Sequence, residues 1–317
     1  MSISGRSFLS SEQLTSDDIK EIFDRAAVFK SEFQKRRSLE KVVKTIGHLP
    51  RVVAMVFSEP STRTRMSFQM AAHRLAVRTI SLDNIAVSSI SKGETLGDTL
   101  RNISAMQPDV MVVRYGDDRF ADEIIHHLPF PVINGGIGAS EHPTQALLDA
   151  FTINEFRGKV KGEKILIVGD VLHSRVANSN LLLLSKMGAE LSYCAPAEYA
   201  PQDDRWKAIR RFSDLNEAVG WASVVMGLRI QKERHAPTDG IGMSIAEYRE
   251  KFRVGTDQLN LLKKDGVLLH PGPVIRGVEF SDHVLKDPRC KVLDQVTNGV
   301  YIRAALLSLI LGLEVQL

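Results

Sequence analysis

The residues best suited to chemistry lie in one short segment, residues 57–68, where a predicted strand gives way to a predicted helix. Ser61, Thr62 and Thr64 bring hydroxyl groups to this point, and Arg63 brings a permanent positive charge with planar donors. Backbone N–H groups at the start of a helix have no partner within the helix, and the helix dipole makes that end positive. The segment therefore predicts a binding site for a phosphate group or another anion.

The predicted anion site does not use a glycine-rich loop. The P-loop pattern is absent from residues 57–68, and no G-x-G-x-x-G follows the strand-like residues 165–168. Hydroxyl and guanidinium groups would therefore bind the anion without a glycine cradle. The missing fingerprint also disfavours a nucleotide-binding oxidoreductase.

Three further arginines follow predicted strands. Arg114 comes at the end of the strand-like residues 110–113, and Arg175 and Arg229 each follow a strand in the second half of the chain. In an open α/β sheet, ligands bind beyond the carboxyl ends of the strands. These arginines are therefore candidates for binding anionic groups, although a single arginine is more often part of a surface salt bridge.

The composition is that of an ordinary globular protein. Of the 317 residues, 44% are hydrophobic and 25% are charged, and the length favours two domains of about 150 residues each. The formal net charge of +3 is too small to predict nucleic-acid binding. Two cysteines, Cys194 and Cys290, cannot form a disulfide framework or a four-thiolate metal site.

No segment predicts export or membrane insertion. Residues 1–6 lack the apolar run of a signal peptide, and the longest apolar stretch, residues 304–313, is too short to cross a bilayer. We therefore expect a reducing, cytoplasmic location without a membrane partner.

Hydrophobic periodicity predicts the elements that position these residues. Residues 15–35 have helical spacing, with Thr15 or Ser16 as the cap and Asp17 and Asp18 at the positive end. The apolar face of this helix comprises Ile19, Ile22, Phe23, Ala26 and Phe29. The sequence thus predicts an amphipathic helix at the start of the chain.

Short apolar runs alternate with helical segments along the rest of the chain. The predicted strands are residues 52–57, 110–113, 132–133, 165–168, 191–194, 224–228 and 267–269. Helices are predicted around residues 66–70, 122–127, 143–156, 180–187 and 298–313. Such alternation is typical of doubly wound parallel sheets.

We therefore predict an α/β fold with two doubly wound parallel-sheet domains joined by interdomain helices. The first domain is predicted at residues 1–149 and the second at residues 150–297. A C-terminal helix, about residues 298–317, is expected to pack back on the first domain.

Two motifs resemble the signatures of a known enzyme family. Ser-Thr-Arg-Thr-Arg at residues 61–65, directly after a strand, resembles the carbamoyl-phosphate motif of the aspartate and ornithine transcarbamoylase family. His-Pro-Thr-Gln-Ala-Leu-Leu-Asp at residues 142–149 resembles the second signature of that family. The two motifs together are far more specific than either alone.

Further segments resemble the aspartate branch of the family. They are Ser-Lys-Gly-Glu-Thr at residues 91–95, Gly-Asp…His-Ser-Arg-Val at 169–176, Leu-Arg-Ile-Gln-Lys-Glu-Arg at 228–234, and His-Pro-Gly-Pro with Arg-Gly-Val-Glu at 270–279. The Ser-Met-Gly and His-Cys-Leu-Pro segments expected of the ornithine branch do not occur. The resemblance covers roughly residues 50–305.

The resemblance implies transfer of the carbamoyl group of carbamoyl phosphate to the α-amino group of L-aspartate, by direct attack through a tetrahedral intermediate. It assigns carbamoyl phosphate to the first domain and aspartate to the second. Catalysis would be mainly positioning and electrostatic stabilisation, with no cofactor and no metal ion. Adjacent His126 and His127 do not change this expectation, because neighbouring helical side chains point in different directions.

The resemblance also implies a role for each candidate residue. The catalytic groups would be Thr64, Lys92, Arg114 and His142. The groups that would bind carbamoyl phosphate are Ser61, Thr62, Arg63, Thr64, Arg114, His142, Gln145 and the backbone of Pro271 and Gly272, with Ser88 and Lys92 from a neighbouring subunit. The groups that would bind aspartate are Lys92, Arg175, Arg229 and Gln231. Glu59 and Arg234 would lie in opposite domains and stabilise a closed form.

A loop shared between subunits implies an obligate homotrimer. Association with a regulatory chain or a dihydroorotase stays open. Two alternative functions also stay open: transfer to another small acceptor, such as oxamate or an acylated ornithine, and a non-catalytic scaffold. Arg175, Arg229 and Gln231 favour a dicarboxylate acceptor, and a scaffold would be expected to lack Lys92, His142 or a substrate arginine.

Three positions depart from the family pattern. Ser58 stands where relatives usually have a large residue, Ile137 stands where many have Asp, and Glu141 precedes His142 where Gln is common. None of these changes removes a candidate chemical group, so they bear on affinity more than on the type of reaction.

Overall fold

The computed structural model describes residues 3–44, 51–59, 61–82, 93–116, 125, 127–230 and 243–316. The chain divides into two compact units: unit 1 is Met1–Leu148 with Val296–Leu317, and unit 2 is Asp149–Gln295. The chain passes between the units twice, within helix α5 (Pro143–Arg157) and within helix α11 (Val292–Ile310).

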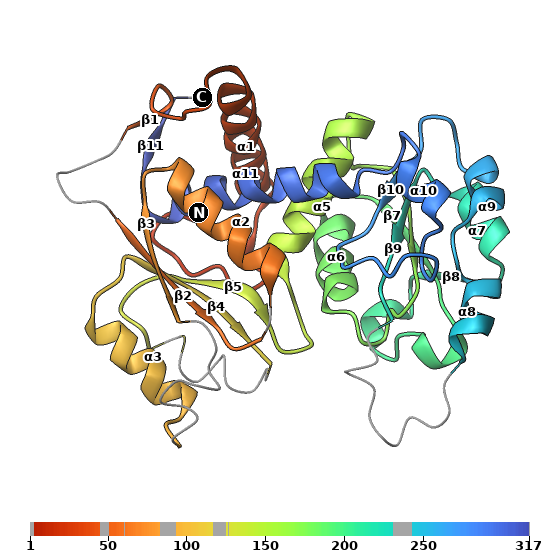
Figure 1. The fold of residues 1–317 in the computed structure, drawn as a ribbon, viewed down its shortest axis with the longest axis horizontal. Helices are drawn as coiled ribbons and strands as arrows, with labels where there is room; N and C mark the ends of the chain where they lie inside the picture. Colours follow the sequence, from red (N-terminus) through yellow and green to blue (C-terminus); the bar gives the residue numbers. More distant parts are fainter. Residues whose placement is uncertain are drawn as a thin grey trace. The chain divides into compact units, whose positions relative to one another are not determined.

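Unit 1 is built on a parallel sheet with the strand order β3-β2-β4-β5. The strands are β2 (Val52–Phe57), β3 (Arg78–Leu82), β4 (Val110–Tyr115) and β5 (Val132–Ile137). Successive side chains of a strand point to opposite faces, so Ala54 and Val56 pack with Leu100 of helix α3 (Leu96–Ala105) on one face. Figure 1 shows α3 on one side of this sheet and helices α1 and α11 on the other.

Helix α1 (Ser16–Arg36) begins and packs as its periodicity predicts. Thr15 is the N-cap: its hydroxyl accepts from the Asp18 N–H, and the Asp18 carboxylate accepts from the Thr15 N–H at 2.9 Å. The apolar residues that it buries are Ile19, Ile22, Phe23, Ala26 and Phe29. The predicted helix, its cap and its core face are therefore confirmed.

Unit 2 is built on a parallel sheet with the strand order β10-β9-β6-β7-β8. The strands are β6 (Lys164–Val168), β7 (Glu190–Cys194), β8 (Arg210–Phe212), β9 (Val224–Gly227) and β10 (Val267–Leu269). The helices of this unit are α6 (Arg175–Lys186), α7 (Leu215–Trp221), α8 (Ile245–Lys251), α9 (Thr256–Leu261) and α10 (Asp282–Lys286). The central strands are buried, as expected where helices cover a parallel sheet.

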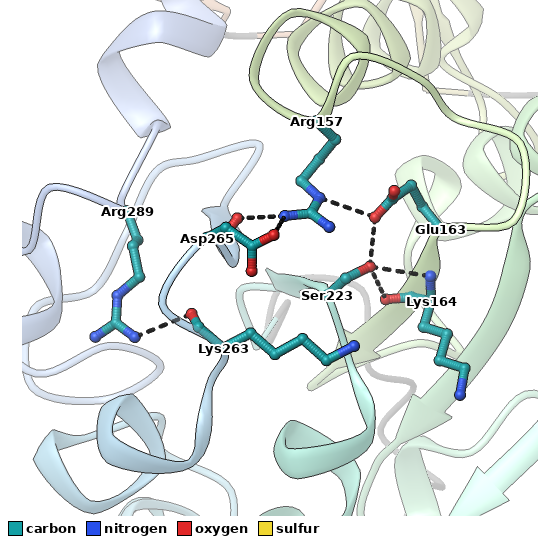
Figure 2. A network of polar contacts seen from close by, with 7 residues as sticks. All are labelled: Arg157, Glu163, Lys164, Ser223, Lys263, Asp265 and Arg289. Atoms are coloured by element: carbon teal, nitrogen blue, oxygen red, sulfur yellow. Dashed lines mark hydrogen bonds and ion pairs between the residues drawn. The ribbon is translucent and has the colours of Figure 1, made fainter.

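Polar side chains join the amino ends of the strands in unit 2 (Figure 2). Arg157, in the last turn of α5, donates from Nε to Oε2 of Glu163 at 2.9 Å, and its Nη1 lies 2.6 Å from Oδ2 of Asp265. Glu163 Oε2 also accepts from the Ser223 hydroxyl at 2.6 Å, and that hydroxyl accepts from the Lys164 N–H at 3.0 Å. These contacts fasten the end of α5 to the strands, and the helix dipole favours a cation at that end.

Two parallel sheets confirm the predicted fold class, and each predicted strand is present. The edge strands β3 and β8 were not predicted because both are polar and largely exposed, so neither shows an apolar run. An antiparallel pair, β1 (Val43–Lys44) with β11 (Glu314–Val315), was also not predicted, since strands of this length have no readable periodicity.

The predicted helices are confirmed in part. Helix α5 matches its predicted range, whereas α11 begins at Val292, before the predicted start at 298, because polar Asp294, Gln295 and Asn298 obscure its first turns. Most of the helix predicted at residues 122–127 lies outside the described residues. Within the part of the chain that the structure describes, no helix has the length and apolar character needed to cross a membrane.

Candidate active site

The start of helix α2 (Thr62–Arg74) leaves the side chain of its N-cap residue unused, unlike the starts of α1 and α6. Ser61 is the N-cap, yet its side chain makes no cap hydrogen bond, whereas Thr15 of α1 and Ser174 of α6 both accept from a helical N–H. The first turn of α2 contains no acidic residue. The positive end of the helix dipole is therefore not compensated by a side chain of α2, which suits it to an external anion.

Thr64 and His142 meet in the interior of unit 1. Their exposed fractions are 7% and 5%, and Thr64 Oγ1 lies 3.3 Å from His142 Nε2, within hydrogen-bonding distance. His142 directly precedes α5, and its carbonyl accepts from the Gln145 N–H at 2.9 Å. The structure thus brings Thr64, His142 and the first turn of α5, with the buried Gln145, to the start of α2.

Arg114 reaches the same edge of the sheet through strand register. It pairs with Phe57, the last residue of β2, so it lies level with the turn that leads into α2. Its Nη1 donates to the Gly135 carbonyl at 3.2 Å, and its Nη2 lies 3.3 Å from Oε2 of Glu59. The Arg114 side chain is 13% exposed. These contacts hold the guanidinium in a fixed position at the carboxyl edge of the sheet.

The three departures from the family pattern take up structural roles. Ser58 donates twice to the Arg114 carbonyl, from its N–H at 2.9 Å and from its hydroxyl at 3.1 Å. Ile137 is buried in the apolar core beneath the sheet. Glu141 accepts from the Ser10 hydroxyl and from the Ser11 N–H, so it ties the N-terminal segment to the residue before His142.

In unit 2, Arg175 is the first residue of α6 and is buried. It follows β6 through a turn that starts at Gly169, whose φ is +122°. A Cβ at Gly169 would lie 2.6 Å from the Leu228 carbonyl oxygen, so only glycine fits where the strand ends. The close approach of the two segments brings the residue after β6 beside the residue after β9.

Arg229 follows β9, next to this turn. The Leu228 N–H donates to the Val168 carbonyl at 2.7 Å, which keeps the segment beside the end of β6. Burial raises the pKa of Glu279 to about 7, against backbone hydrogen bonds and the positive charge of Arg229, which lower it. Glu279 is the last residue of the Arg-Gly-Val-Glu motif, and the sequence assigned it no role. The structure places it among the polar groups near Arg229.

Pro271 and Gly272 follow β10, on the other side of β9. The His270 N–H donates to Oε1 of Gln295 at 2.8 Å, and the Gly272 N–H donates to His270 Nδ1 at 2.9 Å. Because β10, β9 and β6 are neighbours in the sheet, the residues after them share one edge. Arg175, Arg229 and the 271–272 turn therefore belong to the carboxyl edge of unit 2.

Some predicted site residues cannot be placed. Ser88, Lys92, Gln231 and Arg234 lie outside the described residues. Within the described part of the chain, no group of three His, Cys, Asp or Glu side chains could hold a metal ion. Burial raises the pKa of the Cys194 thiol to about 12, which keeps it protonated.

Comparisons with known proteins cover nearly the whole chain. The model of the aspartate/ornithine carbamoyltransferase carbamoyl-P binding domain matches residues 6–155, and that of the Asp/Orn binding domain matches residues 161–310. The chain is 41% identical over 314 residues to the aspartate carbamoyltransferase catalytic subunit of Syntrophotalea carbinolica, covering 99% of this chain and 98% of that relative.

Two solved structures show that the fold serves two acceptors. Aspartate transcarbamoylase from Trypanosoma cruzi, in complex with carbamoyl aspartate and phosphate, has a TM-score of 0.85 and 29% identity, covering 97% of this chain and 96% of that chain. Ornithine carbamoyltransferase from Pyrococcus furiosus has a TM-score of 0.84 and 29% identity, covering 98% and 99%. The choice of acceptor must therefore depend on individual side chains.

Proposed function

Because the chain belongs to the aspartate/ornithine carbamoyltransferase family, we propose that the carboxyl edges of its two sheets bind the two substrates of a carbamoyl transfer. The chain transfers the carbamoyl group of carbamoyl phosphate to the α-amino group of L-aspartate, which yields N-carbamoyl-L-aspartate and phosphate in pyrimidine biosynthesis. The contact of Thr64 with His142 at the start of α2 is the observation that carries the site. In this proposal unit 1 binds carbamoyl phosphate and unit 2 binds aspartate.

The phosphate group is bound at the start of α2. Ser61, Thr62 and Thr64 supply hydroxyl and backbone donors, and Arg63 supplies charge. The uncapped helix start supports this assignment, because its N–H groups and dipole attract a dianion without any loop of glycines. Arg114 bridges the phosphate and the carbonyl oxygen of the carbamoyl group.

The carbamoyl group is polarised from one side and held from the other. His142 donates a hydrogen bond to its carbonyl oxygen, Gln145 accepts from its NH₂ group, and the backbone carbonyls of Pro271 and Gly272 accept from the same NH₂. The neutral amine of aspartate attacks the carbonyl carbon, and negative charge develops on the oxygen near Arg114 and His142. The C–O bond to phosphate then breaks, and the departing phosphate takes up the proton that the amine gives up.

Aspartate is recognised by its two carboxylates. Arg175 binds the α-carboxylate, and Arg229 with Gln231 binds the side-chain carboxylate. The positions of Arg175 and Arg229 after neighbouring strands of one sheet support this assignment. An ornithine side chain would bring an ammonium group towards these arginines, and the like charges would disfavour it.

The chain is proposed to act in the cytoplasm as a homotrimer in which Ser88 and Lys92 complete the site of a neighbouring subunit. Glu59, which contacts Arg114 within unit 1, and Arg234 would stabilise a closed form when both substrates are bound. A mixture of Lys92→Ala and His142→Ala chains should regain partial activity, because some mixed sites then contain both intact residues. Complete inactivity after verified subunit exchange would exclude shared sites.

A panel of acceptors tests the assignment directly. The purified chain is supplied with carbamoyl phosphate and, separately, with L-aspartate, L-ornithine, an acylated ornithine or oxamate, and carbamoylated product is measured. Among these acceptors, only L-aspartate is expected to give a carbamoylated product. Turnover with ornithine or oxamate and none with aspartate would overturn the specificity, and no turnover with any acceptor would favour the scaffold function.

A further inference from the structure

A chain of buried polar side chains runs from helix α5 to the turn after β10. Asp149, Asn180 and Gln295 have exposed fractions of 0%, 0% and 2%. Asp149 Oδ2 accepts from Asn180 Nδ2 at 2.9 Å, and Asp149 Oδ1 accepts from Gln295 Nε2 at 2.7 Å. At its other end the Gln295 amide accepts from the His270 N–H at 2.8 Å. All four residues belong to unit 2.

The orientation of the Gln295 amide is dictated by its two neighbours. A carboxylate can only accept and a backbone N–H can only donate. The amide therefore has to present its NH₂ to Asp149 and its oxygen to His270. The opposite orientation would set the amide oxygen against the carboxylate and the NH₂ against the N–H. Asp149 thus determines which atom of Gln295 faces the turn.

The turn at residues 270–273 has only two backbone N–H donors. Pro271 and Pro273 have no N–H, and Gly272 has a φ of +71°, in the left-handed region. Its two backbone donors are the His270 N–H, bound by Gln295, and the Gly272 N–H, bound by the ring of His270. Gln295 therefore binds the His270 backbone directly before the carbonyls of this turn, while the His270 ring packs edge-on against Phe280 with centroids 5.4 Å apart.

Stability alone gives little reason for a carboxylate in this place. Removing a carboxylate from water is costly, and apolar side chains of the same shape in place of the whole network would fill this space without that cost. A buried polar network does, however, select one arrangement of the groups that it joins. The buried network is therefore explained if the function of the protein requires one fixed orientation of the turn at residues 270–273.

We propose that Asp149 is a positioning residue for carbamoyl transfer. Through the Gln295 amide it fixes the His270 backbone and so aims the carbonyls of Pro271 and Gly272 at the carbamoyl NH₂ group. This inference rests on the proposed function, in which those carbonyls bind that NH₂. In this proposal neither Asp149 nor Gln295 contacts the substrate.

A reciprocal exchange tests the network. Asp149→Asn leaves one acceptor oxygen for the two donors, Asn180 and Gln295, so one of them faces an NH₂ group; Gln295→Glu sets two carboxylates against each other. In the double variant Asp149→Asn/Gln295→Glu, the new NH₂ at position 149 donates to the new carboxylate at 295, which still accepts from the His270 N–H. Each single variant is expected to weaken carbamoyl phosphate binding about tenfold, as for one buried hydrogen bond lost, and the double variant to restore it to within about threefold.

Inorganic phosphate separates positioning from general damage. It occupies the proposed phosphate site in unit 1 but has no NH₂ for the turn to bind. Its inhibition constant should therefore stay within about twofold in every variant, whereas a merely structural role would weaken phosphate and carbamoyl phosphate alike. Asn180→Ala is the matched control: it removes a donor to Asp149 but leaves the path to His270, so carbamoyl phosphate binding should change less than about threefold.

Two outcomes would overturn the inference. One is equal loss of both ligands in the single variants, and the other is a double variant no better than either single variant. If a single variant does not fold, the double variant decides, since it restores each bond and must then fold and bind carbamoyl phosphate. Failure of the proposed function would appear in the wild-type chain as absence of carbamoyl aspartate, whereas failure of this inference leaves the wild type active.

Discussion

The two edges of the unit 2 sheet carry similar residue types in different arrangements. At the amino edge, Arg157 is bound between Glu163 and Asp265, and the helix that carries it ends there (Figure 2). At the carboxyl edge, Arg175 begins a helix, and it lies beyond a strand end where only glycine fits. An arginine at a helix end offsets the negative dipole, whereas one at a helix start adds to the positive dipole.

Unit 1 repeats this difference. Arg51 pairs with Asp109 at 2.7 Å where strands β2 and β4 begin, and Arg114 lies where the same two strands end, level with the start of α2. Helices that connect parallel strands start at the carboxyl edge, so positive dipoles gather there in both units. We therefore expect the edge, and not the residue type, to separate arginines that only stabilise the fold from those proposed to bind an anion.

The largest expected effect is at the carboxyl edge of unit 1. Arg114→Ala removes a guanidinium from the charge that develops in the transition state, and kcat of the folded variant should fall by about 10² to 10³. Arg51→Ala, at the amino edge of the same strands, is the control and should keep kcat within about twofold. A loss below tenfold in Arg114→Ala would show that the assigned role is wrong.

Glu279 sharpens the comparison, because it is a buried carboxyl group among the residues after β9 and β10. Burial raises its pKa from 4.5 to about 7, so the folded chain binds a proton that the unfolded chain releases over this range. Protonation of Glu279 therefore contributes about 3 kcal/mol to the free energy of unfolding below pH 4.5. This contribution is lost as the pH rises to about 7. The unfolding midpoint of the wild type, relative to Glu279→Gln, should fall across this window; parallel pH profiles would contradict the assignment.

Glu163 tests the amino edge of unit 2. Glu163→Gln removes the charge that faces Arg157 and replaces an acceptor for the Ser223 hydroxyl, in a side chain that is buried. The free energy of unfolding should fall by about 2 kcal/mol, measured by urea denaturation, while kcat changes less than about twofold. A large loss of activity at unchanged stability would remove the distinction between the two edges.

The smallest effect is expected at the outer member of the same network. Asp265 also contacts Arg157, but its side chain is 72% exposed, so water screens the pair. Asp265→Asn should therefore lower the free energy of unfolding, measured by urea denaturation, much less than Glu163→Gln does. An equal loss of unfolding free energy in Asp265→Asn and Glu163→Gln would mean that burial does not determine the strength of these two contacts.

Local patterns in the sequence predicted much of the framework. The cap and core face of α1, the strand at Val52–Phe57 and the helix that begins at Pro143 each depend on neighbouring residues, whose periodicity can be read directly. The polar strands β3 and β8 have no such signal, because an edge strand is held by its partner strand more than by burial of its own side chains.

The candidate site divides in the same way. The hydroxyls of residues 61–64 could be assigned to an anion because a strand, a turn and a helix start are adjacent in sequence. The contact of Thr64 with His142 and the level of Arg114 beside Phe57 depend on long-range strand order and register, which no local pattern contains.

The sequence by itself determined the fold class, the family resemblance and the groups proposed to bind a doubly charged substrate, because each rests on residue types at short spacing. Only the tertiary structure decided that Asp149 orients Gln295 and that Gln295 binds the His270 backbone. A hydrogen bond between residues so far apart in the chain exists only once helices α5 and α11 and the end of β10 have packed together.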